Sequence, residues 1–353
     1  MSQPPLRVGL IGYGYAGKTF HAPLISAVPD LQLAAVSSSD AAKVHADWPD
    51  VTVHATPAAL IARDDLDLVV IATPNDTHHP LALAALRAGC HVVIDKPFTV
   101  ALADARELVA LAGEYRQVLS VFHNRRWDGD FLTLRQLVAD GALGRVVEMS
   151  SRHDRFRPEV RQRWRESTGP GAGLWFDLGP HLIDQALQLL GRPRAITLQR
   201  DITRDGAVAD DWFHASLRYD RLHVQLHAGM LVSASAPRFA VHGTLGSFMK
   251  EGLDSQEEAL KAGVRPTWPP QAGWGVDPGR ASRVTRARDG SAVVEPVAML
   301  PGAHMAYFAG VAAAIRGEAA NPVPPEEALA VMELIELGIR SAAQRRELEW
   351  TGL

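Results

Sequence analysis

Residues 6–17 read LRVGLIGYGYAG, an apolar run followed by glycines in the pattern G-x-G-x-x-G. The apolar run predicts a buried strand, and the residues after the glycines are typical of a helix. In such a unit the first glycine permits a tight turn, the second lets a pyrophosphate approach the backbone, and the third allows close helix–strand packing. The phosphates then meet free N–H groups at the helix N-terminus. We expect a dinucleotide to be bound by Gly12, Gly14, Tyr15, Ala16 and Gly17.

The rest of the first third alternates short β-branched runs with stretches rich in Ala and Leu. Gly89 ends one predicted helix, residues 77–88, and Gly113 ends another, residues 101–112. Apolar strands that alternate with helices form a parallel sheet covered on both faces. The expected strands are residues 7–11, 31–36, 51–54, 66–72, 91–95 and 118–122. We therefore predict an α/β fold that begins with a doubly wound Rossmann domain, residues 1–123.

The pattern changes after residue 123. Helices are expected at residues 131–139 and 178–190, and closely spaced strands follow from residue 194 to residue 250. Short turns between such strands indicate an antiparallel sheet. Residues 251–278 are rich in Pro, Gly and Trp and suggest a long surface loop, and two helices close the chain. Residues 124–353 are predicted to form an α+β domain with an open, mostly antiparallel sheet.

The composition of the 353 residues is that of a globular protein, with 47% hydrophobic and 22% charged residues. The net charge of −4 gives no basic field for nucleic acid or an anionic membrane. No apolar stretch is long enough to cross a membrane, and no signal segment is recognised, so a cytoplasmic protein is expected. Cys90 is the only cysteine, which excludes intramolecular disulfides and cysteine-based zinc sites. We expect no bound metal.

The second strand ends in Ser37-Ser38-Ser39, where an NAD enzyme usually carries an acid that binds the ribose hydroxyls. Small hydroxyl side chains accept a 2′-phosphate that a carboxylate would repel. Ser37 and Ser38 therefore favour NADP over NAD. The alternative is that Asp40 reaches back to the ribose, so that NAD is used and the serines only cap a helix.

Open parallel sheets bind ligands beyond the carboxyl ends of their strands. At this edge we expect three groups of residues to contact the cofactor: Thr73, Pro74 and Asn75 with the neighbouring His78; Lys96 and Pro97; and Asn124. The chain has only five lysines, and arginine hardly ever gives up its proton. Lys96, at the mouth of a buried strand, is the amine placed to exchange a proton between an alcohol and a ketone. The alternative is an ordinary solvated Lys-Pro turn.

A second group of residues, Asp177 and His181, follows Gly173. Pro180 is tolerated in a first helical turn, which would place Asp177 near the N-cap. The i, i+4 spacing then puts His181 on the same side of the helix. A carboxylate beside an imidazole orients it for acid–base work. The alternative is a capping aspartate with an unrelated histidine.

Together these motifs resemble the Gfo/Idh/MocA oxidoreductases. The glycine loop, Asp95-Lys96-Pro97 in place of that family's Glu-Lys-Pro, and G-x-x-x-D-x-x-x-H at Gly173, Asp177 and His181 carry the resemblance, which spans essentially the whole chain. The strings at residues 18–24, 121–128 and 153–158 are similar to the branch that contains NADP-dependent scyllo-inositol 2-dehydrogenases. Asp95 in place of Glu is a departure that leaves the lysine unchanged.

The resemblance implies that Lys96 and His181 handle the proton of a substrate hydroxyl, that Asp177 positions the substrate and the histidine, and that hydride passes to or from nicotinamide. The substrate is then a cyclic polyol or sugar. The expected substrate contacts are Lys96, Asn124, Asp154, Trp164, Asp177 and His181, with Arg125, Arg152 and Arg157 as further candidates.

The family's second-domain sheet typically forms a subunit interface, so a homodimer or homotetramer is expected. His223, Gln225 and His227, which share one face of a strand, are then interface or solvated residues rather than zinc ligands. Two other functions stay open: an NAD-dependent glycosidase that retains its cofactor, and a non-catalytic NADP-binding regulator.

Overall fold

The structure is a computed structural model that describes residues 3–234 and 236–352. The chain forms two compact units. The first runs to Asn124 and also contains Gln256–Trp274 and Ala303–Leu329; the second contains Arg125–Ser255, Gly275–Gly302 and the chain from Ala330 onward. The sequence predicts a single domain boundary after residue 123, which places Gln256–Trp274 and Ala303–Leu329 in the second domain. By packing, these two segments belong to the first unit.

The first unit contains a six-stranded parallel sheet in the order β3-β2-β1-β4-β5-β6. Its strands are β1 (Leu6–Ile11), β2 (Leu31–Ser37), β3 (Thr52–His54), β4 (Leu68–Ile71), β5 (His91–Ile94) and β6 (Leu119–Val121). The strand ends are in register, because Ile11 pairs with Ser37 and Ile71, and Ile94 pairs with Ile71 and Val121. The residues that follow these strands therefore emerge along one edge, and the predicted Rossmann fold is confirmed.

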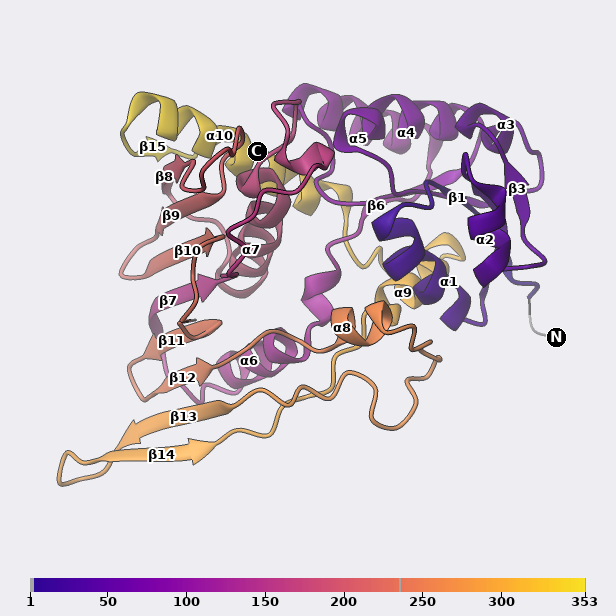
Figure 1. Ribbon diagram of the computed structural model, residues 1–353. Coiled ribbons are helices and arrows are strands. Elements are labelled where there is room, and N and C mark those ends of the chain that lie inside the picture. Colours follow the sequence, from indigo (N-terminus) through magenta and orange to yellow (C-terminus); the bar gives the residue numbers. More distant parts are fainter. Residues whose placement is uncertain (1–2, 235, 353) are drawn as a thin grey trace. The chain divides into compact units, whose positions relative to one another are not determined.

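Helices cover both faces of this sheet, with α4 packed on α5 and α1 packed on α9 (Figure 1). They are η1 (Gly17–His21), α1 (Ala22–Ala27), α2 (Ala41–Asp47), α3 (Pro57–Ile61), η2 (Asn75–Thr77), α4 (His78–Arg87), α5 (Leu102–Tyr115), α8 (Gln256–Lys261) and α9 (Met305–Ile315). The prediction that Gly113 stops a helix is wrong. α5 continues to Tyr115 and ends on Arg116, which takes the left-handed conformation (φ 54°) that glycine usually supplies.

The second unit contains a nine-stranded sheet in the order β14-β13-β12-β11-β7-β10-β9-β8-β15. β10 and β7 pair in parallel and the other neighbours pair antiparallel, so the predicted open, mostly antiparallel sheet is confirmed. The strands are β7 (Val146–Arg152), β8 (Ala195–Asp201), β9 (Trp212–Arg218), β10 (His223–Gly229), β11 (Phe239–Gly243), β12 (Ser247–Lys250), β13 (Ala281–Arg286), β14 (Ala292–Pro296) and β15 (Leu348–Glu349).

One face of this sheet is buried by helices. α7 packs on β9 and β10, and the ring of Trp175 stacks edge-on against Phe213 while its indole N–H donates to the carbonyl of Ile335 (3.1 Å). Burial alternates along β9, so the other face stays partly exposed. The helices are η3 (Asn124–Trp127), α6 (Gly129–Ala139), η4 (Trp164–Glu166), α7 (Leu174–Leu190) and α10 (Pro325–Gln344), the last of which begins in the first unit.

α7 begins earlier than the sequence predicts. Gly173 is its N-cap and Leu174 its first residue, so Pro180 lies inside the helix rather than in the first turn. Asp177 lies in the first turn, near the N-cap as predicted, and the N-cap itself is Gly173 rather than the capping aspartate of the alternative. Pro180 does not mark the first turn of α7. It removes only one backbone N–H, and packing of the helix on both sides of Pro180 keeps the helix continuous.

Residues 256–274 are not only a surface loop. They start with α8 and pack with the first unit, although the chain enters them from β12 and leaves them toward β13 of the second. We call residues 256–274 the strap. Among the helices that the structure describes, none has the length and apolar composition needed to cross a membrane.

Candidate active site

The glycine loop has the shape that a dinucleotide needs. A Cβ on Gly12, whose φ is +96°, would lie 2.5 Å from the carbonyl oxygen of Ala72, and one on Gly17 would lie 2.0 Å from that of Gly12. Neither position accepts a side chain. A Cβ on Gly14 would meet nothing within 4 Å, so the space beside the second glycine is open to a pyrophosphate. The chain is helical from Tyr15, which puts a helix N-terminus at this space.

The end of β2 carries the residues predicted to choose the nucleotide. Ser37 is buried, and Ser38 Oγ accepts a hydrogen bond from the Asp40 N–H (3.1 Å). The Asp40 carboxylate caps α2 by accepting from the Lys43 N–H (3.0 Å). The Lys43 ammonium in turn donates to the carbonyl of Tyr13 in the glycine loop (3.0 Å). One oxygen of the Asp40 carboxylate is thus used for capping, while the Lys43 ammonium lies at the glycine loop.

A buried histidine connects the next two turns along the sheet edge. His78 Nδ1 lies 2.9 Å from the carbonyl of Pro97 and Nε2 lies 3.1 Å from the carbonyl of Thr73. Burial lowers the pKa of His78, against the opposing charge of Asp95. His78 is fully buried, so it can influence the cofactor only indirectly, by holding the turns that contain Thr73 and Pro97.

Lys96 is the second residue after β5 and is only 9% exposed, and its peptide bond to Pro97 is cis. Its N–H donates to Asp95 Oδ1 (2.9 Å), an oxygen that also lies 3.6 Å from His21 Nε2. Asn75, which begins η2 after β4, is likewise buried. The residues predicted after β1, β2, β4 and β5 therefore share one edge of the sheet within the first unit.

Asn124, predicted to contact both cofactor and substrate, is the last residue of the first unit's N-terminal segment and begins η3. It is buried, with 6% of its surface exposed.

In the second unit the start of α7 is built around Asp210. The Asp210 carboxylate accepts from the Trp175 N–H (2.8 Å), and its backbone carbonyl accepts from the Leu174 N–H (2.7 Å). A Cβ on Gly173, whose φ is +95°, would lie 2.3 Å from Asp210 Oδ1. Glycine is required at residue 173 because Asp210 occupies that space. Burial raises the pKa of Asp210, although the bond from Trp175 and the charge of Arg200 oppose it.

A pocket opens beside this helix start, and Asp177 lies in its wall. Arg165 Nε is 3.4 Å from Asp177 Oδ1, and the Arg165 guanidinium lies over the Trp164 ring at 4.5 Å. The other charges of the wall are paired as well: Arg163 with Glu166, and Arg204 with Glu166 and Asp211. The wall therefore holds three arginines and four acids, the fourth being Asp210, which pairs with Arg200 (3.2 Å).

His181 lies one turn after Asp177 on α7 and is 6% exposed. Trp164 is not among the residues that line the pocket, but its ring lies under the guanidinium of Arg165, which is. Asp154 is placed elsewhere, between Arg152 Nε (2.8 Å) and His227 Nε2 (3.3 Å) at the sheet. Burial and the charge of Arg152 lower the pKa of His227 to about 4. His227 is therefore a neutral ring beside a carboxylate.

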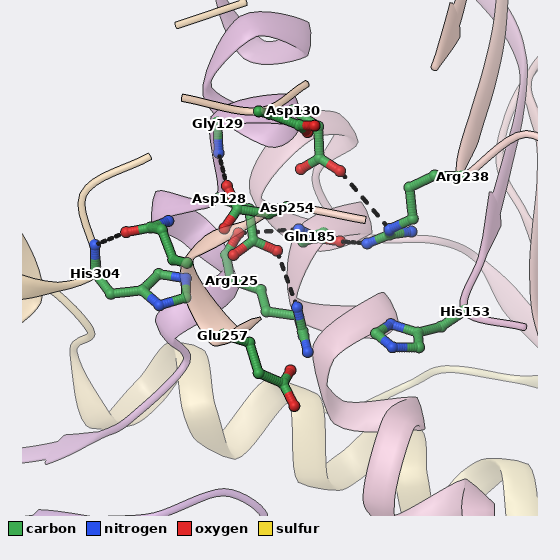
Figure 2. Close-up of polar contacts among 12 residues, drawn as sticks. Arg125, Asp128, Gly129, Asp130, His153, Gln185, Arg238, Asp254, Glu257 and His304 are labelled. Carbon is green, nitrogen blue, oxygen red and sulfur yellow. Dashed lines mark hydrogen bonds and ion pairs between the residues drawn. The ribbon is translucent and has the colours of Figure 1, made fainter. Parts of the chain in front are cut away.

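A buried charge network around α6 was missed from the sequence (Figure 2). Arg238 donates to Gln185 Oε1 (2.6 Å) and Ser151 Oγ (2.6 Å), and its Nε lies 3.9 Å from Asp130 Oδ2. Burial raises the pKa of Asp130 to about 7, although Arg238 opposes the shift. The same network includes Arg125 with Asp128 and the Gly129 N–H with Asp254. Residues spaced so far apart give no local signal in the sequence.

Two family models match the chain. The NAD-binding Rossmann fold of the Gfo/Idh/MocA oxidoreductases matches residues 6–123, and their C-terminal alpha/beta domain matches residues 135–350. The chain therefore belongs to the Gfo/Idh/MocA family of oxidoreductases, and the resemblance seen in the sequence is confirmed.

Relatives match over nearly the whole length. The oxidoreductase YdgJ of Escherichia coli (strain K12) is 55% identical over 343 residues, which cover 97% of this chain and 98% of YdgJ. IolW of Bacillus subtilis (strain 168), a scyllo-inositol 2-dehydrogenase (NADP(+)), is 36% identical over 344 residues, covering 97% and 95%. A solved oxidoreductase structure from Yersinia pestis has a TM-score of 0.94 at 52% identity, covering 99% of this chain and 98% of that one.

Proposed function

We propose that this oxidoreductase uses NADP and transfers hydride between the nicotinamide and a secondary alcohol or ketone of a cyclic polyol or sugar, with scyllo-inositol as the first substrate to test. The observation that carries the proposal is the place of Lys96: a nearly buried amine at the end of β5, on the sheet edge that also holds the glycine loop. The similarity to IolW supports the choice of a polyol and of NADP.

The chain's own groups have defined tasks in this proposal. The glycine loop and the helix start at Tyr15 bind the pyrophosphate, and Asn75 and Pro97 border the nicotinamide. When bound, the nicotinamide accepts or donates the hydride. Lys96 and His181 exchange the proton of the substrate hydroxyl, and Asp177 positions the substrate and His181.

Replacing Lys96 tests the proton-transfer role. Lys96→Ala is expected to bind NADPH like the wild type and to lose turnover by about two orders of magnitude or more, the usual contribution of a positioned acid–base group. Lys96→Arg is the matched control, because arginine keeps the positive charge but does not release its proton. Stopped-flow absorbance of the nicotinamide measures turnover, and fluorescence titration measures binding. Wild-type turnover in Lys96→Ala contradicts the assignment.

The same absorbance assay separates the alternatives. A dehydrogenase shows net reduction of added NADP with inositols, aldoses or ketoses. A glycosidase that retains its cofactor shows product without net reduction, and a regulator binds the nucleotide without any turnover. Either result overturns the proposed reaction.

Preference for NADP is tested at Ser38. Ser38→Asp places a carboxylate where we propose the 2′-phosphate binds, and like charges in contact cost enough to raise the KM for NADP by about tenfold or more. The KM for NAD should change far less. Asp40→Asn tests the alternative that Asp40 holds the ribose of NAD, because asparagine still caps α2. Equal wild-type rates with NADP and NAD contradict the role of Ser37 and Ser38.

We also propose that the chain forms a homodimer or homotetramer through the partly exposed face of the second unit's sheet, on which His223 and Gln225 lie. Light scattering of the purified protein measures the mass directly, and a monomer at micromolar concentration contradicts the proposal.

A further inference from the structure

The strap, residues 256–274, lies against the part of the first unit that follows the glycine loop. Its helix α8 packs on η1, the helical turn that begins at Gly17. The strap thus brings a segment distant in sequence to the phosphate-binding turn.

One attachment of the strap is a hydrogen bond to the glycine loop itself. The Tyr15 hydroxyl donates to Glu257 Oε1 (3.1 Å), and the same oxygen pairs with the Lys261 ammonium (2.9 Å). The Tyr15 ring also packs edge-on against Phe20, with ring centroids 5.8 Å apart. Burial and Glu257 raise the pKa of Tyr15, so its hydroxyl keeps the proton that it donates. The side chain is therefore fixed at both its ring and its hydroxyl.

A second attachment lies beyond α2. The Arg265 guanidinium stacks 4.0 Å over the ring of Trp48, which follows that helix. Asp47, next to it, accepts from the Tyr13 hydroxyl (2.8 Å) and pairs with Lys18 (2.8 Å). Although burial opposes it, Lys18 and Tyr13 hold the pKa of Asp47 below its ordinary value. The strap is consequently attached at Tyr15 and at Trp48, whose neighbour Asp47 binds Tyr13 of the glycine loop.

Tyr15 links this attachment to the ligand space. It directly follows Gly14, whose open side faces that space, and its N–H is the first of the helix. A loop that is already ordered loses less conformational entropy when a ligand binds, which increases affinity. The Tyr15–Glu257 hydrogen bond restrains the turn that follows Gly14.

We propose that the strap is part of the cofactor site and that Glu257 is a positioning residue, which holds the phosphate-binding turn through the Tyr15 hydroxyl. The inference rests on the proposed function only in taking a nicotinamide dinucleotide as the ligand. It assigns to cofactor binding a segment that lies outside the family's Rossmann match, which ends at residue 123.

The test measures NADPH affinity in variants of the full-length chain. Tyr15→Phe and Glu257→Ala each remove the hydrogen bond, and each should weaken binding about three- to tenfold, the scale of one ordinary, solvent-exposed hydrogen bond. Because both remove the same bond, the double variant should bind no more weakly than either single one. Glu257→Gln keeps the accepting oxygen and should recover most of the affinity.

Glu258→Ala is the matched control. Glu258 is adjacent to Glu257, also pairs with Lys261 (2.7 Å) and has a side chain that is 76% exposed. The Tyr15 hydroxyl donates to Glu257 and not to Glu258. It should bind NADPH as the wild type does. Thermal melts without ligand confirm that each variant is folded. Wild-type affinity in both single variants, or effects that multiply in the double variant, overturns the inference. Failure of the wild type to bind NADPH or NADH contradicts the proposed function instead.

Discussion

The two units each contain a helix that starts behind a glycine of positive φ, and the two starts differ in what occupies them. Gly12 (φ +96°) leads to the helix that begins at Tyr15, and Gly173 (φ +95°) leads to α7. Beside the first, a Cβ on Gly14 would meet nothing within 4 Å. At the second, the Asp210 carboxylate already accepts the N–H of Trp175.

The difference bears on the ligands that we propose for the two units. A helix N-terminus attracts anions through its free N–H groups and its dipole. The space beside Gly14 leaves the first start open, as the proposed phosphate contact requires. At the second start, Asp210 already accepts two N–H groups, that of Trp175 at its carboxylate and that of Leu174 at its backbone carbonyl. The second start is therefore less suited to an anion, which agrees with the uncharged polyol that we propose.

The largest effect is expected in the glycine loop. Gly17→Ala puts a methyl group 2.0 Å from the Gly12 carbonyl oxygen, and the backbone shift that it forces should destabilise the unit by about 2 kcal/mol or more and abolish NADPH binding. Gly14→Ala is the matched control for stability: its melting temperature should be unchanged, while NADPH binding weakens about tenfold or more through overpacking of the ligand space. Thermal melts and fluorescence titration separate the two. A Gly14→Ala variant with normal affinity contradicts the idea that this start is left open for a phosphate.

A smaller effect is expected at the start of α7. Asp210→Ala removes the carboxylate that caps the helix and should cost about 1–2 kcal/mol in the free energy of unfolding, measured by urea denaturation. Asp205→Ala, an exposed acid in the same loop, is the control and should change stability little. Asp210→Asn keeps an oxygen for the Trp175 N–H and should retain most of the stability.

The difference in unfolding free energy between wild type and Asp210→Asn, measured as a function of pH, shows whether Asp210 is buried as described. Because burial raises the folded-state pKa of Asp210, the folded chain holds this proton more tightly than the unfolded chain. Its contribution to stability is therefore complete below the unfolded pKa of about 4 and is lost as the pH rises through the folded value. Asp210→Asn does not titrate, so its stability relative to wild type should increase from about pH 4 upward. A constant difference contradicts the assignment.

The smallest effect on stability is expected at Arg165. Its ion pair with Asp177 joins side chains that are 21% and 17% exposed, so Arg165→Ala should cost at most about 1 kcal/mol. We expect the KM for the polyol to rise severalfold and the NADPH affinity to stay unchanged. Arg161→Ala, an exposed arginine of the same loop, is the control. A change in NADPH affinity, with no change in the KM for the polyol, would contradict the proposal that the start of α7 serves the polyol and the glycine loop serves the cofactor.

The first unit could be predicted closely because its signals are local. Each parallel strand is a continuous apolar run, and the functional residues follow the strands closely, as Lys96 follows β5. Even the choice of glycines follows from contacts between near neighbours, such as Gly12 and Gly17. The end of α5 differs from the prediction because Arg116 accepts the left-handed conformation expected of Gly113.

The second unit could not be predicted to the same depth, because its site depends on residues far apart in the chain. Nothing near Gly173 reveals that Asp210 caps α7, and this cap is what allows the helix to begin before Asp177. The sequence also predicts a loop where the strap lies. Its packing could not be foreseen, because its partners Tyr15 and Trp48 lie more than two hundred residues earlier in the chain.

The imidazole of His78, held between the carbonyls of Thr73 and Pro97, has a consequence for engineering. Because one ring joins the turn after β4 to the turn after β5, neither turn can be exchanged with that of a relative without disturbing the other. A graft that changes only the Asn75 turn would also displace the backbone beside Lys96. The two turns and His78 are therefore best transplanted as one piece.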